Sequence, residues 1–157
     1  PNKYYDYNEK IINSIFNKIK KNFISKGFQL ILIPSMRTPK KIINLAKDYF
    51  DNNQIIVNDV DKKAYLSSLS LADYIIVTCD STSMISEAAM TGKPIYIAQM
   101  PPIKKNERFK NFFKTFESLN IVKELGDNIE NWNYEKLNET DKISGYIKDK
   151  LNNYDFS

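Results

Sequence analysis

A short polar turn that leads into a helix is the stretch of this chain best suited to hold an anion. It reads CDSTS from Cys79 to Ser83, and apolar residues then recur at helical spacing. Small residues at a helix start leave backbone N–H groups at the positive end of the helix dipole, where a phosphate or diphosphate is stabilised. Ordinary N-caps have the same composition, so both interpretations stay open for the turn alone. The candidate phosphate-binding residues here are Ser81, Thr82, Ser83 and Met84.

Glu87 favours the anion-binding interpretation. A capping-box glutamate follows a Ser or Thr by three residues, but Met84 stands three residues before Glu87. On a helix Glu87 shares a face with Ser83, one turn nearer the loop. A carboxylate one turn beyond a bound phosphate is placed to accept hydrogen bonds from ribose hydroxyls. The alternative is a solvent-exposed helix glutamate.

A second polar group follows another apolar run of the chain. Residues 28–33 are apolar apart from Gln29, as in a strand buried on both faces, and Ser35, Arg37 and Thr38 come directly after it. Because parallel strands end at one edge of a sheet, we expect these side chains beside the turn at 79–83. Arg37 could neutralise a phosphate with its fork of donors, or it could be an ordinary surface arginine.

The elements around these residues alternate between strand and helix. Apolar runs predict strands at 28–33, 54–57, 74–78 and 94–98, and no hairpin signal separates them. Apolar residues at helical spacing predict helices from Asn8, from Thr38 as cap with Pro39 in the first turn, over 61–71, from Met84 to the stop at Gly92 and Pro94, over 109–119, and over 143–151. This alternation predicts an α/β fold with a doubly wound parallel sheet, that is, a Rossmann-like domain.

Composition excludes several classes of chemistry. The chain has 157 residues, 42% of them hydrophobic, which fits one domain with a substantial core. It has no histidine, which removes Ser-His-Asp and Cys-His catalysis and histidine-based zinc sites. Its four glycines allow neither a GxGxxG turn nor a GxxxxGK[ST] loop. The single cysteine, Cys79, forms no internal disulfide, and we expect it to be a small buried filler.

Charge and hydropathy indicate the compartment. The net charge is +4, but the lysines are scattered and offset by 19 acidic residues, so we expect no nucleic-acid partner. No apolar run is long enough for a membrane span, and no signal peptide is recognisable. We therefore expect a soluble, cytoplasmic protein.

Two motifs resemble a known family. The stretch TCDSTSMISEAAMTGKP is similar to the T-x-DS-x-SM-x-SEA-x-x-x-GKP signature of the mitochondrial-fission-protein family of the elongated-mitochondria type, and SMRTP resembles its S-x-R-TP motif. A helix start followed by Glu and then Gly-x-Pro also looks like the nucleotide-sugar binding unit of GT-B glycosyltransferases. This resemblance implies two Rossmann-like domains, of which the chain resembles the second. Pro1 would then lie just after an upstream opening strand, so residues 1–157 would be a fragment whose sheet lacks one strand and whose N-terminal domain is a missing partner.

The resemblance also implies a donor site. It places a diphosphate on the amides near Thr82 and Ser83, a ribose on Glu87 and further phosphate contacts at Ser35 and Arg37. The base would lie near Val57, Asn58 and Asp59, at the end of the strand predicted at 54–57. The implied ligand is a nucleotide-diphosphate sugar, with no cofactor and no metal, because GT-B enzymes stabilise the leaving diphosphate with amides and basic residues.

Three interpretations remain at this stage. The first is the donor-binding half of a GT-B-type glycosyltransferase-like protein, whose catalytic base would come from outside this chain. The second is a non-catalytic adaptor, since plant members of the family are linked to recruiting a dynamin-related protein at mitochondria. The third is a plain doubly wound domain with an unrelated ligand. A homo-oligomer formed through an unpaired sheet edge is compatible with each of them.

Overall fold

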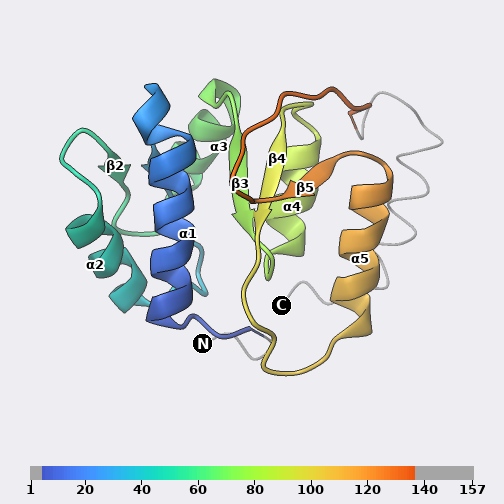
Figure 1. Cartoon of the computed structure of the whole chain (residues 1–157), viewed down its shortest axis with the longest axis horizontal. Coiled ribbons are helices and arrows are strands. Elements are labelled where there is room, and N and C mark those ends of the chain that lie inside the picture. Colours follow the sequence, from blue (N-terminus) through green and yellow to red (C-terminus); the bar gives the residue numbers. More distant parts are fainter. Residues whose placement is uncertain (1–4, 137–157) are drawn as a thin grey trace.

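The computed structural model describes residues 5–136, in which helices and parallel strands alternate along the chain (Figure 1). The predicted helix at 143–151 lies outside the described residues. The elements in order are α1 (Glu9–Asn22), the short 3-10 helix η1 (Ile24–Lys26), β1 (Ile31–Leu32), α2 (Lys40–Tyr49), β2 (Ile55–Ile56), α3 (Lys62–Leu71), β3 (Ile75–Thr78), α4 (Thr82–Ala89), β4 (Ile95–Ala98), α5 (Glu107–Ser118) and β5 (Val122–Glu124).

The strands form two parallel groups. β1 pairs with β2, Ile31 opposite Ile55, and the second group has the order β3-β4-β5. In Figure 1, α1 lies in front of the strands and α4 lies behind β4. Helices on both faces of parallel strands are the Rossmann-like arrangement that the alternation predicts, and this fold class is confirmed.

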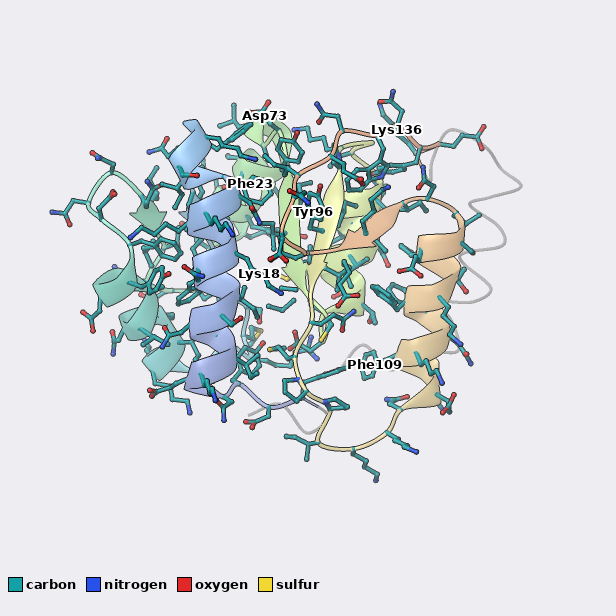
Figure 2. The ribbon with its side chains drawn as sticks, viewed as in Figure 1. Lys18, Phe23, Asp73, Tyr96, Phe109 and Lys136 are labelled. Carbon is teal, nitrogen blue, oxygen red and sulfur yellow. The ribbon has the colours of Figure 1, made fainter. Side chains whose placement is uncertain are left out.

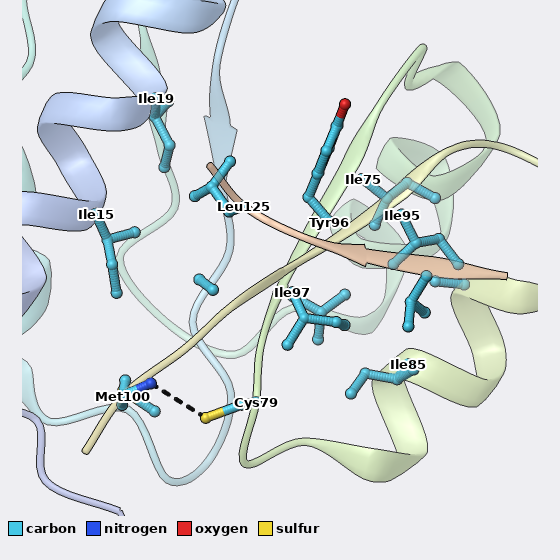
Figure 3. Packing of buried hydrophobic residues seen from close by; sticks show 14 of the residues in the cluster. Ile15, Ile19, Ile75, Cys79, Ile85, Ile95, Tyr96, Ile97, Met100 and Leu125 are labelled. Atoms are coloured by element: carbon cyan, nitrogen blue, oxygen red, sulfur yellow. Dashed lines mark hydrogen bonds between the residues drawn. The ribbon is translucent and has the colours of Figure 1, made fainter. Parts of the chain in front are cut away.

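The core is centred on β4, whose residues from Ile95 to Ala98 are all buried. α1 presents Ile15 and Ile19 to one face of this strand, and Ile85 of α4 lies on the other (Figure 3). Both helices repeat apolar residues every three or four positions, which gives each a stripe that can be buried.

Aromatic side chains pack the C-terminal end of α1 against the sheet. Phe23 is buried, and its ring lies 5.4 Å from that of Tyr74 and 6.0 Å from that of Tyr96, in edge contacts (Figure 2). Trp132 packs edge-on against the other side of the Tyr96 ring at 5.2 Å. Edge contacts of this kind add to the hydrophobic stabilisation of the rings.

Some expectations differ from the structure. The strand predicted at 28–33 is only two residues long, and Ile31 is 37% exposed rather than buried on both faces, because β1 has a strand neighbour on one side only among the described residues. The sequence does not predict β5, because the charged residues Lys123 and Glu124 interrupt any apolar strand pattern, although both pair with β4. Thr38 does not cap α2; Pro39 is the N-cap, because the Thr38 hydroxyl closes the turn with Ser35 instead.

Candidate functional site

The carboxyl ends of β1 and β3 bring two of the predicted polar groups together. Arg37, in the loop after β1, donates a hydrogen bond from Nη2 to the backbone oxygen of Asp80, 3.2 Å away, in the turn after β3. These residues are 43 positions apart in the sequence. The structure thus places a guanidinium group beside the start of α4, as the parallel arrangement predicts.

Hydrogen bonds within the loop between β1 and α2 shape it. The hydroxyl of Thr38 accepts a bond from the amide of Ser35 at 2.9 Å and lies 3.2 Å from the Ser35 hydroxyl. The Ser35 hydroxyl accepts a longer bond, 3.3 Å, from the amide of Arg37. Ser35 and Thr38 therefore hold the loop that presents Arg37, and their hydroxyls are already engaged in doing so.

The start of α4 has no side-chain cap. Ser81 is the N-cap, and its side chain makes no capping hydrogen bond to the first turn. Ser81 and Thr82 are 3% and 2% exposed, whereas Ser83 and Met84 are only half-buried. A ligand would therefore reach the first-turn amides from the side of Ser83 and Met84.

A buried hydrogen bond joins Tyr7 to Asp80, next to the start of α4. The hydroxyl of Tyr7 donates to Oδ2 of Asp80 at 2.9 Å, and Asp80 is 2% exposed. Burial raises the pKa of the Tyr7 phenol, and the Asp80 carboxylate raises it further. Tyr7 therefore stays protonated and acts as a donor that fixes the Asp80 side chain.

Glu87 lies on the exposed side of α4, away from the buried Ile85 and Ala88. Its neighbour on α3 is Tyr65: burial raises the pKa of the Tyr65 phenol, and Glu87 raises it further. Glu87 is thus accessible to a ligand, one turn beyond Ser83, on the side of α4 that faces α3. Whether it contacts a ribose stays a prediction.

The predicted base-binding residues lie after β2. Val57 is half-buried, and its amide donates to the Leu32 oxygen of β1. Asn58 and Asp59 are exposed, and Asp59 forms an ion pair with Lys40 of α2 at 3.1 Å. The structure brings Arg37 and the start of α4 together, whereas the base subsite stays a separate prediction.

Cys79 fits the expectation of a buried filler. It is 8% exposed, and its Sγ accepts a hydrogen bond from the Met100 amide at 3.3 Å (Figure 3). Burial raises the pKa of this thiol to about 12. The nucleophilic thiolate is therefore scarce at neutral pH, and we assign Cys79 no chemical role.

The side chains of the site give an anion little net attraction. Arg37 contributes one guanidinium group, whereas Asp80 and Glu87 contribute two carboxyl groups, so an anion would be attracted chiefly by the α4 amides together with Arg37. Within residues 5–136 no group of three or more acidic, histidine or cysteine side chains could hold a metal ion. The same residues contain no helix with the length and apolar character that crossing a bilayer requires.

Sequence reasoning missed two site residues. Tyr7 lies in a stretch without periodicity, 73 positions from Asp80, and no local signal indicates their pairing. Tyr65 lies on the predicted helix at 61–71, but its proximity to Glu87 depends on how α3 packs beside α4. Both contacts are tertiary, so spacing along the chain could not reveal them.

Comparison with known proteins decides the family. The model of the family described as "Mitochondrial fission ELM1" matches residues 1–151. The chain belongs to the mitochondrial fission ELM1 family. An uncharacterized protein of Rickettsia prowazekii, RP120, is 33% identical over 157 residues, which cover 94% of this chain and 43% of that protein.

A plant relative of the ELM1 family also matches. The mitochondrial fission protein ELM1 of Arabidopsis thaliana is 31% identical over 122 residues, which cover 74% of this chain and 28% of the plant protein. The chain therefore spans less than half the length of these two curated relatives. No solved structure matches it.

Proposed function

We propose that this ELM1-family chain is the donor-binding part of a GT-B-type glycosyltransferase-like protein and holds the diphosphate of a nucleotide sugar. The observation that supports this most is the contact between Arg37 and the Asp80 oxygen, which fixes a cation beside the uncapped start of α4. A helix start with a neighbouring guanidinium suits a diphosphate, because amides and a fork of donors share its charge.

Each part of the ligand has its own partners in this proposal. The diphosphate lies over the first-turn amides near Ser83 and Met84, with Arg37 on its other side. The ribose hydroxyls donate to Glu87, one turn further along α4. The base lies toward Asn58 and Asp59. Within residues 5–136 we assign no general base. The buried Tyr7 and Cys79 have raised pKa values and lack the exposure that proton transfer with a substrate requires.

Titration calorimetry on the full-length protein tests the proposal. We expect UDP or GDP, and the corresponding nucleotide sugars, to bind, and Glu87→Ala to weaken binding by about tenfold or more, since one hydrogen bond to a charged group contributes about 1.5 kcal/mol or more. Glu117→Ala is the matched control, because Glu117 is an exposed glutamate on α5 and should leave binding unchanged.

A ligand lacking the ribose hydroxyls sharpens the assignment of Glu87. The wild type should prefer the ribonucleotide to its 2′,3′-dideoxy analogue, whereas Glu87→Ala should bind the two alike. If UDP, GDP and their sugars all fail to bind the full-length protein, the donor-binding proposal is wrong. The non-catalytic adaptor is then the better interpretation.

A further inference from the structure

A deep apolar slot separates the two groups of parallel strands. Its volume is about 530 Å³, and it is lined by residues 29–33, which include β1, and by residues 74–78, which include β3. One wall is the apolar face of α1, with Ile12, Ile15 and Ile19. The opposite wall comes from α3 and α4, which contribute Leu69, Met84 and Ala88. The slot is therefore bounded by strand edges on two sides and by helices on the other two.

The two strand edges that face the slot offer backbone hydrogen-bonding groups. The Leu30 and Leu32 oxygens accept bonds from the amides of Ile55 and Val57, and the Ile75 and Cys79 amides donate to the oxygens of Pro94 and Ala98. Because N–H and C=O groups of successive residues point to opposite sides of a strand, those of Ile31, Ile33 and Ile76 face the slot. Within residues 5–136, β1 has only β2 as a strand neighbour and β3 has only β4.

We propose that a strand inserts into this slot, parallel to both β1 and β3, and joins the two groups into one sheet of order β2-β1-strand-β3-β4-β5. A strand suits the slot better than a small molecule, because only a backbone can pair with both edges along their length. Its side chains would meet α1 on one face and α3 with α4 on the other. The inserted segment should therefore be a nearly continuous apolar run.

The occupant that fits is the segment that precedes Pro1 in the full-length protein. Tyr7 bonds to Asp80, and the amide of Asp6 donates to the Pro101 oxygen at 3.1 Å, so the chain enters α1 from the edge where β3 and β4 end. A strand parallel to β3 would end at that same edge. The relatives are more than twice as long as the matched region, so they have further chain outside it from which such a strand could come.

The connection through α1 also has the favoured geometry. A strand in the slot, α1 over one face and β1 on the neighbouring position form a βαβ unit, whose crossover is right-handed in nearly all proteins. α1 already lines the slot with apolar side chains, among them Ile12, Ile15 and Ile19. The chain would move outward through β1 and β2 and then cross back to β3, so the inserted strand would lie at the switch point where such sheets bind ligands. The inference itself stands without the proposed donor function.

Hydrogen exchange of the full-length protein, resolved to single amides, tests whether the slot is filled. We expect the amides of Ile31, Ile33 and Ile76 to exchange within about tenfold of the amide of Val57, which is already bonded to Leu32. Exchange of the three slot-facing amides a hundredfold or more faster than that of Val57 would overturn the proposal.

Photo-crosslinking of the full-length protein identifies the occupant. A benzoylphenylalanine at Leu69, which lines the slot, should crosslink to a peptide that precedes Pro1. The same group at Leu66, which is 51% exposed on the same helix, should not. Crosslinks from position 69 to residues 137–157, to a second copy of the chain or to no upstream peptide would each contradict the assignment.

Discussion

At the scale of single residues, the Tyr7–Asp80 pair decides how the candidate site is shaped. It joins the chain just before α1 to the turn before α4, and Arg37 contacts the backbone of that same turn. Burying a carboxyl group is costly unless it accepts hydrogen bonds, so the phenol of Tyr7 stabilises a conformation that the polar turn would not hold by itself. Arg37 and the α4 amides thereby keep fixed relative positions.

Removing the Tyr7 hydroxyl should destabilise this region measurably. We expect Tyr7→Phe to lower the free energy of unfolding by about 1–3 kcal/mol, because Oδ2 of the buried Asp80 loses a donor. The measurement is the urea midpoint of the full-length protein, followed by hydrogen exchange in peptides from this chain. Tyr49→Phe is the control: its hydroxyl bonds to Asn17 at an exposed position, and we expect a change of about 0.5 kcal/mol or less. Equal effects of the two substitutions would contradict this account of Asp80.

At the scale of elements, the βαβ unit from β3 to β4 supports the site. Ile75 pairs with Ile95 and Thr78 with Ala98, and α4 connects the two strands across one face. α4 ends at Ala89, and Gly92, with φ of +75°, turns the chain into β4. A left-handed conformation at that position suits glycine because it has no Cβ.

Replacing this glycine should strain the turn after α4. We expect Gly92→Ala to cost about 1–2 kcal/mol of stability, since an L-residue pays that amount in the left-handed region. The Cβ would also press on the flexible end of Lys136, at 2.8 Å, which can move aside. Gly126→Ala is the matched control, because a Cβ there meets no atom within 4 Å and no positive φ opposes it. Thermal unfolding of both variants gives the comparison, and a Gly92→Ala protein as stable as Gly126→Ala would show that the backbone at this turn is not strained.

The sequence predicts elements well where local pattern determines them. The runs that become β3 and β4 are apolar and β-branched, and the helices α1 and α5 repeat their apolar residues at helical spacing. β5 escapes prediction because its three residues include Lys123 and Glu124, and only pairing with β4 makes them a strand. Thr38 is predicted to cap a helix, but its hydroxyl instead accepts a local hydrogen bond from the Ser35 amide, three residues earlier.

The candidate site likewise combines features that the local sequence pattern predicts with features that depend on tertiary contacts. That the Arg37 loop and the start of α4 lie at one edge follows from parallel strands alone, and the contact between them confirms it. That Ser81 and Thr82 are almost fully buried, and that Tyr7 bonds to Asp80, depends on side chains far apart in the sequence. That Ser83 and Met84 are more accessible than Ser81 and Thr82 therefore depends on tertiary packing, which the local sequence pattern does not reveal.

At the scale of the whole molecule, helices pack around two groups of parallel strands, and an apolar slot lies between the two groups. The candidate site lies at the carboxyl ends of β1 and β3, the strands that border the slot. A strand inserted there would end beside Arg37 and Asp80, and the loop after it would complete the site. This chain of the ELM1 family thus combines a Rossmann-like arrangement of helices and parallel strands with a slot that, in our proposal, a further strand fills.

The most direct test of the central claim is to titrate UDP and GDP, and the corresponding nucleosides, into full-length wild-type protein and the variants Arg37→Gln and Lys47→Gln. The account predicts that a diphosphate binds much more tightly than its nucleoside and that Arg37→Gln weakens it about tenfold or more, since a hydrogen bond to a charged group contributes about 1.5–3 kcal/mol. Lys47→Gln, an exposed change on α2, should bind like the wild type. Binding by Arg37→Gln as tight as that of the wild type, or no binding of either diphosphate, would contradict the claim that this helix start holds a nucleotide diphosphate.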